Sequence, residues 1–176
     1  MKKRKGILLI EALFVLGIMA ILIGMVMVYY SHTEEKYIAN ETVQEVIVLF
    51  NFISDYKSQH GNVNGIDVKF LKASNVLPDK YFSGDSTLLT PSKGTIALTA
   101  VPTWGTGEVA VWLNGISKES CMALAQMDIA AFTNVRRVNW EKEYDQSVTA
   151  SMSPSDAEKR CNENGDNDAV EFNVGY

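Results

Sequence analysis

The sequence predicts an α+β protein in which a long N-terminal α-helix packs against an antiparallel β-sheet held by one disulfide. Three observations lead to this fold. An apolar block covers residues 7–30, helical periodicity continues to about residue 60, and short alternating segments with two cysteines follow. With 176 residues, 47% of them hydrophobic and 21% charged, the chain is long enough for one globular domain. The composition excludes collagen-like and low-complexity disordered chains.

Charge is divided unequally along the chain. Residues 1–6 contain 4 of the 16 basic side chains and no acidic one, whereas the remainder carries 12 basic side chains against 21 acidic ones. An acidic body repels nucleic-acid phosphates, so no nucleic-acid partner is predicted.

The apolar block, Ile7–Tyr30, is long enough to cross a membrane. Its 24 residues form a helix of roughly 36 Å at about 1.5 Å per residue, and a hydrocarbon core is about 30 Å thick. A cleavable secretory signal has a shorter apolar stretch and then an Ala-x-Ala-like site, which is not found here. The basic residues 2–5 predict a cytoplasmic N-terminus, with everything after Tyr30 on the opposite side. A plain single-span anchor accounts for the same observations.

Glu11 is the one Asp, Glu, Lys, Arg or His residue within this block. A carboxylate at membrane depth costs at least a few kcal/mol and is usually paired and functional. The alternative is that Glu11 lies close enough to the headgroups to snorkel. Cleavage of the Gly6–Ile7 bond would remove all four basic residues and create an amino group on Ile7, one helical turn from Glu11. Between two staggered helices the same two charges pair intermolecularly, which would make Glu11 an assembly residue.

The stretch Lys5-Gly6-Ile7-Leu8-Leu9-Ile10-Glu11-Ala12 resembles the type IV prepilin signature. That signature has a basic leader ending in Gly, an apolar first mature residue and Glu at the fifth mature position. The resemblance implies that a prepilin peptidase removes residues 1–6 and N-methylates Ile7. It also implies that Glu11 contacts the N-terminal amine of a neighbouring subunit, and that residues 7–30 are the transmembrane segment and then the fibre core.

Helical periodicity continues through residues 31–61 as the amphipathic half of the same helix. Apolar residues recur at spacings of three and four, and Gly61 is a helix stop. One helix from about Leu8 to His60 is therefore predicted. Its apolar face carries Val43, Val46, Ile47, Phe50, Ile53 and Tyr56, and its polar face carries Glu41, Gln44, Glu45 and Asn51.

Residues 62–176 are predicted to form a globular α+β head. Residues 62–65 read as a turn, residues 67–77 as a short helix that ends before Pro78, and residues 83–94 as a loop. Apolar alternation before and after Gly105-Thr106-Gly107 predicts a β-hairpin. Two strands are not stable alone. The candidates for further strands are residues 132–140 and the C-terminal run, in which Val170, Phe172, Val174 and Tyr176 share one face.

The two cysteines each belong to a short predicted helix. Cys121 follows a helix start at Ser117, and Cys161 ends a segment that Ser153 caps. Because this part of the chain is predicted to lie outside the cytoplasmic membrane, the two cysteines most simply form one disulfide. The alternative is a catalytic or metal-binding thiol, but the two histidines fall on the long helix without ligand spacing, so no metal is predicted.

The order of these head elements resembles the type IVb pilins, and the bundle-forming pilins of enteric bacteria in particular. The elements that carry the resemblance are a loop, a strand pair, a helix with a cysteine, the Ser153-Pro154-Ser155-Asp156 segment before the second cysteine, and a terminal strand. The resemblance implies the major structural subunit of a type IV pilus, a homo-oligomeric helical surface filament for adhesion, aggregation or cell–cell contact.

The same resemblance implies partners and locations. The partners are prepilin peptidase, the pilus assembly machinery and a host or bacterial surface. The precursor would lie in the bacterial inner membrane with a cytoplasmic leader and a periplasmic head, before it enters an extracellular pilus. A minor pilin or a type II secretion pseudopilin is one alternative, and a monomeric membrane-anchored periplasmic binding domain is another.

Motifs for catalysis are missing from the sequence. It contains no Gly-x-Ser-x-Gly, no phosphate loop and no His-Glu-x-x-His, so neither an enzyme nor a cofactor is predicted. The segment 162–168 carries calcium-type oxygens but lacks the Gly and Glu that an EF-hand loop requires. A solvated acidic turn is therefore preferred to a calcium site.

Overall fold

The computed structural model of the chain describes residues 4–101, 107–128, 132, 135–140, 151–162 and 168–174. The chain divides into two compact units between Tyr37 and Ile38. Helix α1 (Arg4–His60) begins in the first unit and ends in the second.

Helix α1 confirms the prediction of one long helix. It ends next to Gly61, whose φ is +72° and whose amide donates to the Lys57 carbonyl at 2.7 Å. A left-handed backbone is accessible to glycine without a steric penalty, so the helix stops where this residue occurs.

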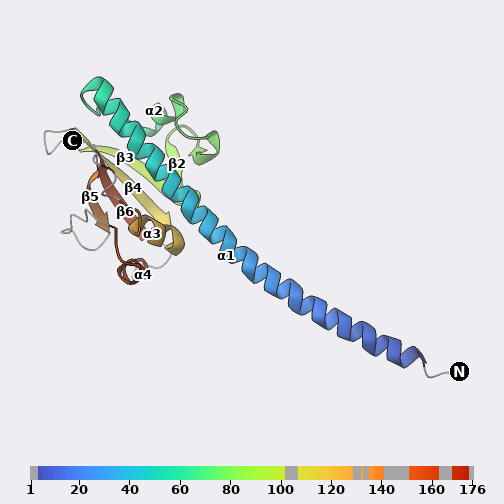
Figure 1. Cartoon of the computed structure of the whole chain (residues 1–176). Coiled ribbons are helices and arrows are strands. Elements are labelled where there is room, and N and C mark those ends of the chain that lie inside the picture. Colours follow the sequence, from blue (N-terminus) through green and yellow to red (C-terminus); the bar gives the residue numbers. More distant parts are fainter. Residues whose placement is uncertain are drawn as a thin grey trace. The chain divides into compact units, whose positions relative to one another are not determined.

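The described residues of the second unit form a six-stranded antiparallel sheet in the order β1-β2-β3-β4-β6-β5 (Figure 1). β3 and β4 form the predicted hairpin, although residues 105 and 106 of its turn lie outside the described residues. Strand β6 lies between β4 and β5, so the last strand of the chain is an interior one. The strands are β1 (Phe82–Ser83), β2 (Thr87–Leu89), β3 (Thr95–Val101), β4 (Glu108–Ile116), β5 (Val135–Trp140) and β6 (Asp168–Val174).

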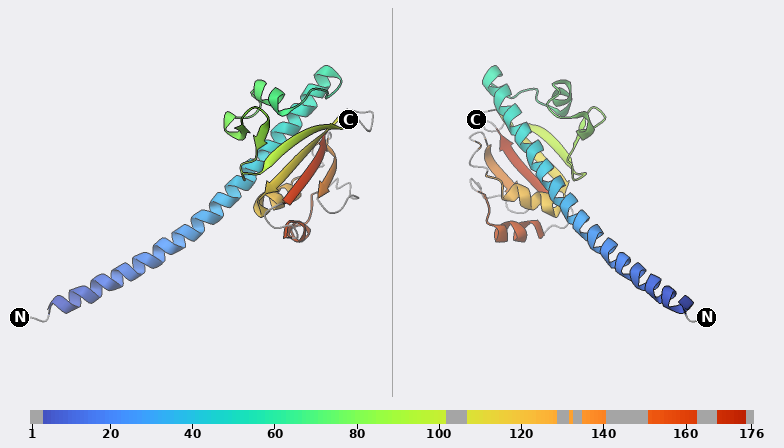
Figure 2. Two further views of the ribbon diagram at one scale, coloured as in Figure 1. Left: turned by 180° about the vertical axis from the view of Figure 1, so that it is seen from behind. Right: turned by 45° about the vertical axis from the view of Figure 1, so that its right-hand side comes forward.

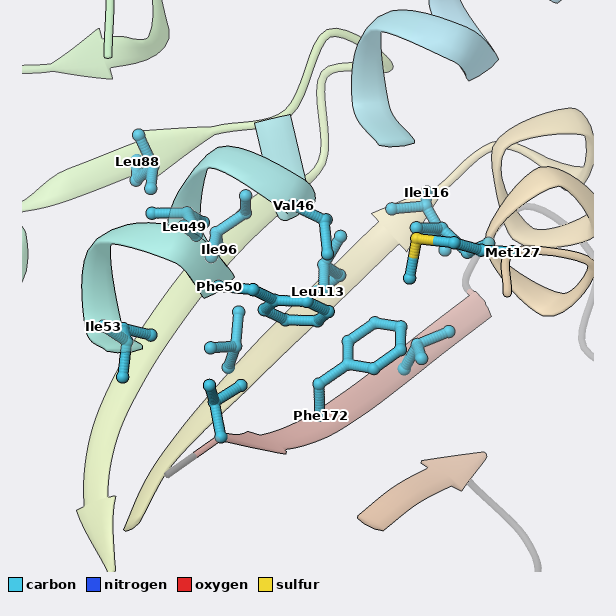
Figure 3. Packing of buried hydrophobic residues seen from close by; sticks show 14 of the residues in the cluster. Val46, Leu49, Phe50, Ile53, Leu88, Ile96, Leu113, Ile116, Met127 and Phe172 are labelled. Atoms are coloured by element: carbon cyan, nitrogen blue, oxygen red, sulfur yellow. The ribbon is translucent and has the colours of Figure 1, made fainter. Parts of the chain in front are cut away.

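The C-terminal half of α1 packs on one face of this sheet, as both views of Figure 2 show. Figure 3 shows Phe50 facing Leu113 of β4 and Phe172 of β6. The Phe50 and Phe172 rings meet edge to face, with centroids 5.2 Å apart. Alternation along β6 is confirmed for three of the four predicted positions, and Tyr176 lies outside the described residues. The fully buried residues of this core include Val46, Leu49, Phe50, Ile53, Val109, Val111, Leu113, Val170, Phe172 and Val174.

A second layer covers α1 from another side. It consists of α2 (Val68–Ala73) and the 3₁₀ helix η1 (Asp79–Tyr81). The predicted short helix is thus confirmed, and the Asp67 side chain caps it by accepting from the Phe70 amide at 2.7 Å. Residues 83–94 were predicted to be a loop. That prediction is wrong in part, because they also hold the end of β1 and the whole of β2, two strands too short for alternation to reveal.

This second layer changes the face that α1 presents to water. Gln44 and Asn51 are exposed, as predicted for the polar face. Glu45 is buried, with only 3% of its surface accessible, so its assignment to the polar face is wrong. The physical reason is that η1 contacts α1 at Glu41, one turn before Glu45, so the covered arc of the helix extends beyond the apolar stripe.

Two short helices carry the disulfide. Ser117 accepts from the Ser120 amide at the start of α3 (Lys118–Ala125), and Ser153 accepts from the Asp156 amide at the start of α4 (Pro154–Asn162). Both caps were predicted. Cys121 and Cys161 form the predicted disulfide, with a Cα–Cα distance of 5.9 Å.

Candidate functional site

Glu11 lies on α1 among exposed apolar side chains. Every described side chain from Leu9 to Tyr37 is exposed, and Leu9, Ile10, Leu13 and Phe14 around Glu11 are each more than 60% accessible. An apolar surface of this extent is not stable in water as an isolated molecule, so it requires either lipid or other protein. In the part of the chain that the structure describes, this helix is the one segment long and apolar enough to cross a membrane.

Gly6 and Ile7 belong to the first turns of the same helix. Four positions separate Ile7 from Glu11, which corresponds to about 6 Å along the helix axis. If the Gly6–Ile7 bond were cut, the new N-terminus would therefore lie about one helical turn from Glu11 within the same subunit. The proposed roles of these three residues remain predictions.

The structure brings the two predicted cysteines together, and this pairing excludes the zinc or catalytic-thiol alternative. Across the described residues there is no group of three His, Cys, Asp or Glu side chains arranged to hold a metal ion. Most of the segment 162–168, considered above for calcium, lies outside the described residues.

A polar cluster that was not predicted joins α1 to η1. The Lys80 ammonium lies 2.5 Å from Glu41 Oε1, and the Tyr81 hydroxyl donates to the same oxygen. We call Glu41, Lys80 and Tyr81 the α1–η1 clasp. These two hydrogen bonds hold the pKa of the Glu41 carboxyl below its ordinary value, and the bond from Lys80 has the larger effect. Burial and the bond to Glu41 raise the pKa of the Tyr81 hydroxyl.

Glu45 lies one helical turn after Glu41, the member of this clasp that belongs to α1. Both of its carboxylate oxygens are buried, and neither has a hydrogen-bond partner among the described residues. Burial, reinforced by the negative charge of Glu41 and opposed by Lys80, raises the pKa of Glu45 to about 8. A carboxyl group in such a place is neutral near pH 7, because the charged form loses its hydration without gaining a partner.

One feature of the sequence indicates this cluster. Glu41 and Glu45 are spaced i, i+4, a like-charge arrangement that is unfavourable on an exposed helix face. The partners Lys80 and Tyr81 follow 39 and 40 positions after Glu41, a separation at which no local pattern operates.

An exposed apolar helix with one carboxylate near its start, followed by an α+β head with a disulfide, defines the class of the type IV pilins. A family model described as Bundlin matches residues 31–176. The chain therefore belongs to the bundlin family, and with it to the type IVb pilins.

No curated protein gives a match to this sequence. Among solved structures, a type IVb pilin from Salmonella typhi is similar over 82% of this chain and 97% of its own length, with 14% identity and a TM-score of 0.46.

Family membership confirms the type IVb pilin resemblance that the sequence predicted. Pilins are structural subunits rather than enzymes, and the family is one whose members polymerise into filaments. An apolar N-terminal helix fits a subunit that is anchored in a membrane before it enters a pilus.

Proposed function

We propose that this chain is the major subunit of a type IVb pilus, made as a membrane-anchored precursor and polymerised into a surface filament. The observation that carries this proposal is the apolar surface of residues 9–30, exposed along its whole length and interrupted by Glu11, in a chain of the bundlin family. A surface of this kind serves a subunit whose neighbours are either lipids or copies of itself.

Processing is the first step of the proposal. Prepilin peptidase cleaves after Gly6, removes the four basic residues of the leader and N-methylates Ile7. The cleavage exchanges a basic segment that holds the N-terminus in the cytoplasm for a single amine at the membrane level. The chain then consists of a fibre-core segment at residues 7–30, an amphipathic segment at residues 31–61 and a head at residues 62–176.

Glu11 then directs assembly. A carboxylate surrounded by apolar side chains is costly until it is paired, and the amine of Ile7 in a neighbouring subunit supplies the opposite charge. Both charges are satisfied only when two helices pack with an axial offset. Repetition of the same offset contact is heterologous and does not close, which produces a helical filament.

Apolar burial stabilises the filament once it has left the membrane. Burying one large apolar side chain contributes about 1.5–3 kcal/mol relative to water. Transfer from lipid into the fibre gains little from apolarity, because lipid is as apolar as the fibre core. An assembly machine must therefore supply the work of extraction.

Intact-mass measurement of the chain from its native cells tests the processing step. We expect a mass that corresponds to residues 7–176 with one added methyl group and one disulfide. A chain that keeps residues 1–6 in a fully piliated cell would contradict the proposal, and it would favour the monomeric anchored domain.

A Glu11→Gln variant tests the assembly step, because the side chain keeps its shape and loses its charge. We expect normal processing and membrane insertion, but a large loss of sheared surface filaments in cells without the wild-type subunit. Glu34→Gln is the matched control, since Glu34 is an exposed carboxylate on the same helix beyond the apolar segment. Equal piliation by the two variants would remove the role assigned to Glu11.

The composition of sheared filaments separates a major subunit from its alternatives. If this chain is the main protein by mass, it is the major pilin. If it is present at a few copies per filament, or is confined to the cell envelope, it is a minor pilin or a pseudopilin. Adhesion, aggregation and cell–cell contact are then distinguished by comparing cells with and without the filament.

A further inference from the structure

We propose that Glu45 makes the packing of η1 on α1 depend on protonation, so that η1 stays closed over the neutral carboxyl and opens when the carboxyl ionises. This inference concerns the second compact unit alone and does not depend on the proposed role in a pilus.

The burial of Glu45 is the geometric basis. Its residue surface is 3% accessible, and both carboxylate oxygens are sealed from water without a partner among the described residues. Its neighbours along the helix on the same side are Thr42 and Leu49, both fully buried. The Thr42 hydroxyl is used within the helix, where it donates to the Ile38 carbonyl at 2.9 Å. Glu45 thus has no local substitute for the water that its burial excludes.

The charged groups that act on Glu45 come from α1 and η1. On α1, Glu41 one turn earlier disfavours ionisation, and on η1 the Lys80 ammonium favours it. Lys80 is already engaged by Glu41 at 2.5 Å, and its side chain remains 61% accessible. Tyr81, in the same turn, uses its hydroxyl on Glu41 as well. The clasp therefore stabilises the charge of Glu41 and leaves Glu45 to be accommodated as a neutral acid.

The direction of the pH effect follows from proton linkage. In the closed state the pKa of Glu45 is raised from an ordinary 4.5 to about 8, and in an open, hydrated state it returns toward the ordinary value. Between these two values the closed state binds one more proton than the open state, so rising pH favours opening. The population of the open state grows by about tenfold per pH unit in this window and levels off above it.

The structural consequence is confined to the second layer over α1. Opening releases the clasp and the turn of η1, in which the Tyr81 amide donates to the Pro78 carbonyl at 3.1 Å and the Phe82 amide donates to Asp79. The sheet core on the other side of α1 is built from buried apolar side chains such as Phe50, Leu113 and Phe172, so it stays closed.

Hydrogen exchange of the full chain in detergent micelles tests the inference. The probes are the amides of Tyr81 and Phe82, and their protection is corrected for the pH dependence of intrinsic exchange. We expect protection in the wild-type chain to fall by about 100-fold between about pH 5.5 and pH 7.5. The amides of β4 serve as an internal reference and should keep their protection.

Glu45→Gln supplies the decisive comparison, because glutamine has nearly the same shape as a neutral carboxyl and does not ionise. We expect its corrected protection at Tyr81 and Phe82 to be constant with pH. Glu34→Gln removes an exposed carboxylate from the same helix and should behave like the wild type. Constant protection in the wild-type chain, or an equal pH response in Glu45→Gln, would overturn the inference.

A second variant keeps the test decisive if Glu45→Gln does not fold. Glu41→Gln removes the neighbouring negative charge and frees Lys80 for Glu45, so the pH at which opening levels off should move downward. An unchanged levelling point in Glu41→Gln would also count against the inference.

Discussion

Two carboxylates on α1 illustrate how surroundings decide the role of a residue. Glu11 is exposed among apolar side chains, so its environment is whatever surrounds the helix, either lipid or another subunit. Glu45 is enclosed by its own chain, one helical turn from the contact of Glu41 with η1. The first is open to pairing between molecules, whereas the second responds to solvent pH only through movement of its cover.

Gly94 is a residue at which a single added methyl group should destabilise the fold. A Cβ atom built there would lie 2.4 Å from the Asn114 carbonyl oxygen and 2.7 Å from that of Gly115, both of them backbone atoms that have little freedom to move. The turn before β3 therefore approaches β4 at a distance that only glycine permits. We expect Gly94→Ala to lower the free energy of unfolding by about 1–3 kcal/mol, measured by chemical denaturation in detergent.

Asn114→Ala is the matched control for this prediction. The contact with Gly94 is made by the Asn114 backbone, and the Asn114 side chain is exposed. Its removal should change stability by no more than about 0.5 kcal/mol. A Gly94→Ala chain as stable as the wild type would show that the turn can move away from β4.

At the scale of elements, the disulfide ties α3 to α4. The segment before α4 is also bonded to the end of α3, because the Met152 amide donates to the Ala125 carbonyl at 2.9 Å. The disulfide between Cys121 and Cys161 closes a loop with a sequence separation of 40. In the chain-entropy model a loop of this length contributes about 4 kcal/mol by restricting the unfolded chain.

The paired substitution Cys121→Ser and Cys161→Ser should therefore lower the free energy of unfolding by about 2–4 kcal/mol. Reduction of the wild-type chain should lower its melting temperature in the same way, and the double variant should not respond to the reductant. Similar melting of the oxidised and reduced wild-type chain would mean that α3 and α4 hold each other without the bond.

Local signals explain which elements the sequence predicted. The end of α1 depends on Gly61, the starts of α3 and α4 depend on Ser117 and Ser153, and the hairpin depends on period-two alternation. Each of these signals acts over a few residues, and each prediction was confirmed.

Long-range packing explains what the sequence did not predict. The insertion of β6 between β4 and β5 is a choice among strand orders that alternation alone does not distinguish. The burial of Glu45 depends on a segment more than thirty residues away that covers a helix position whose residue type indicates exposure. The prediction of the polar face failed at that position because periodicity describes one helix and not its neighbours.

At the scale of the whole molecule, the two compact units depend on different surroundings. All members of the hydrophobic core cluster lie at or after Val43, and no described side chain between Leu9 and Tyr37 is buried. The first unit thus contributes no described buried residue to the fold of the second. Its exposed apolar surface needs lipid or other subunits, whereas the second unit has a closed core of its own.

This division predicts that a fragment comprising residues 31–176 folds without the apolar segment. We expect it to be soluble without detergent and monomeric, because it keeps every described buried side chain and loses the exposed apolar residues up to Tyr30. Sedimentation should give the mass of one chain, and thermal unfolding should be cooperative with the Cys121–Cys161 bond intact. The full chain is the control and should need detergent to remain dispersed. An unfolded fragment would show that the head requires the first unit for its stability, and a fragment that polymerises would place an assembly surface of comparable strength on the head itself.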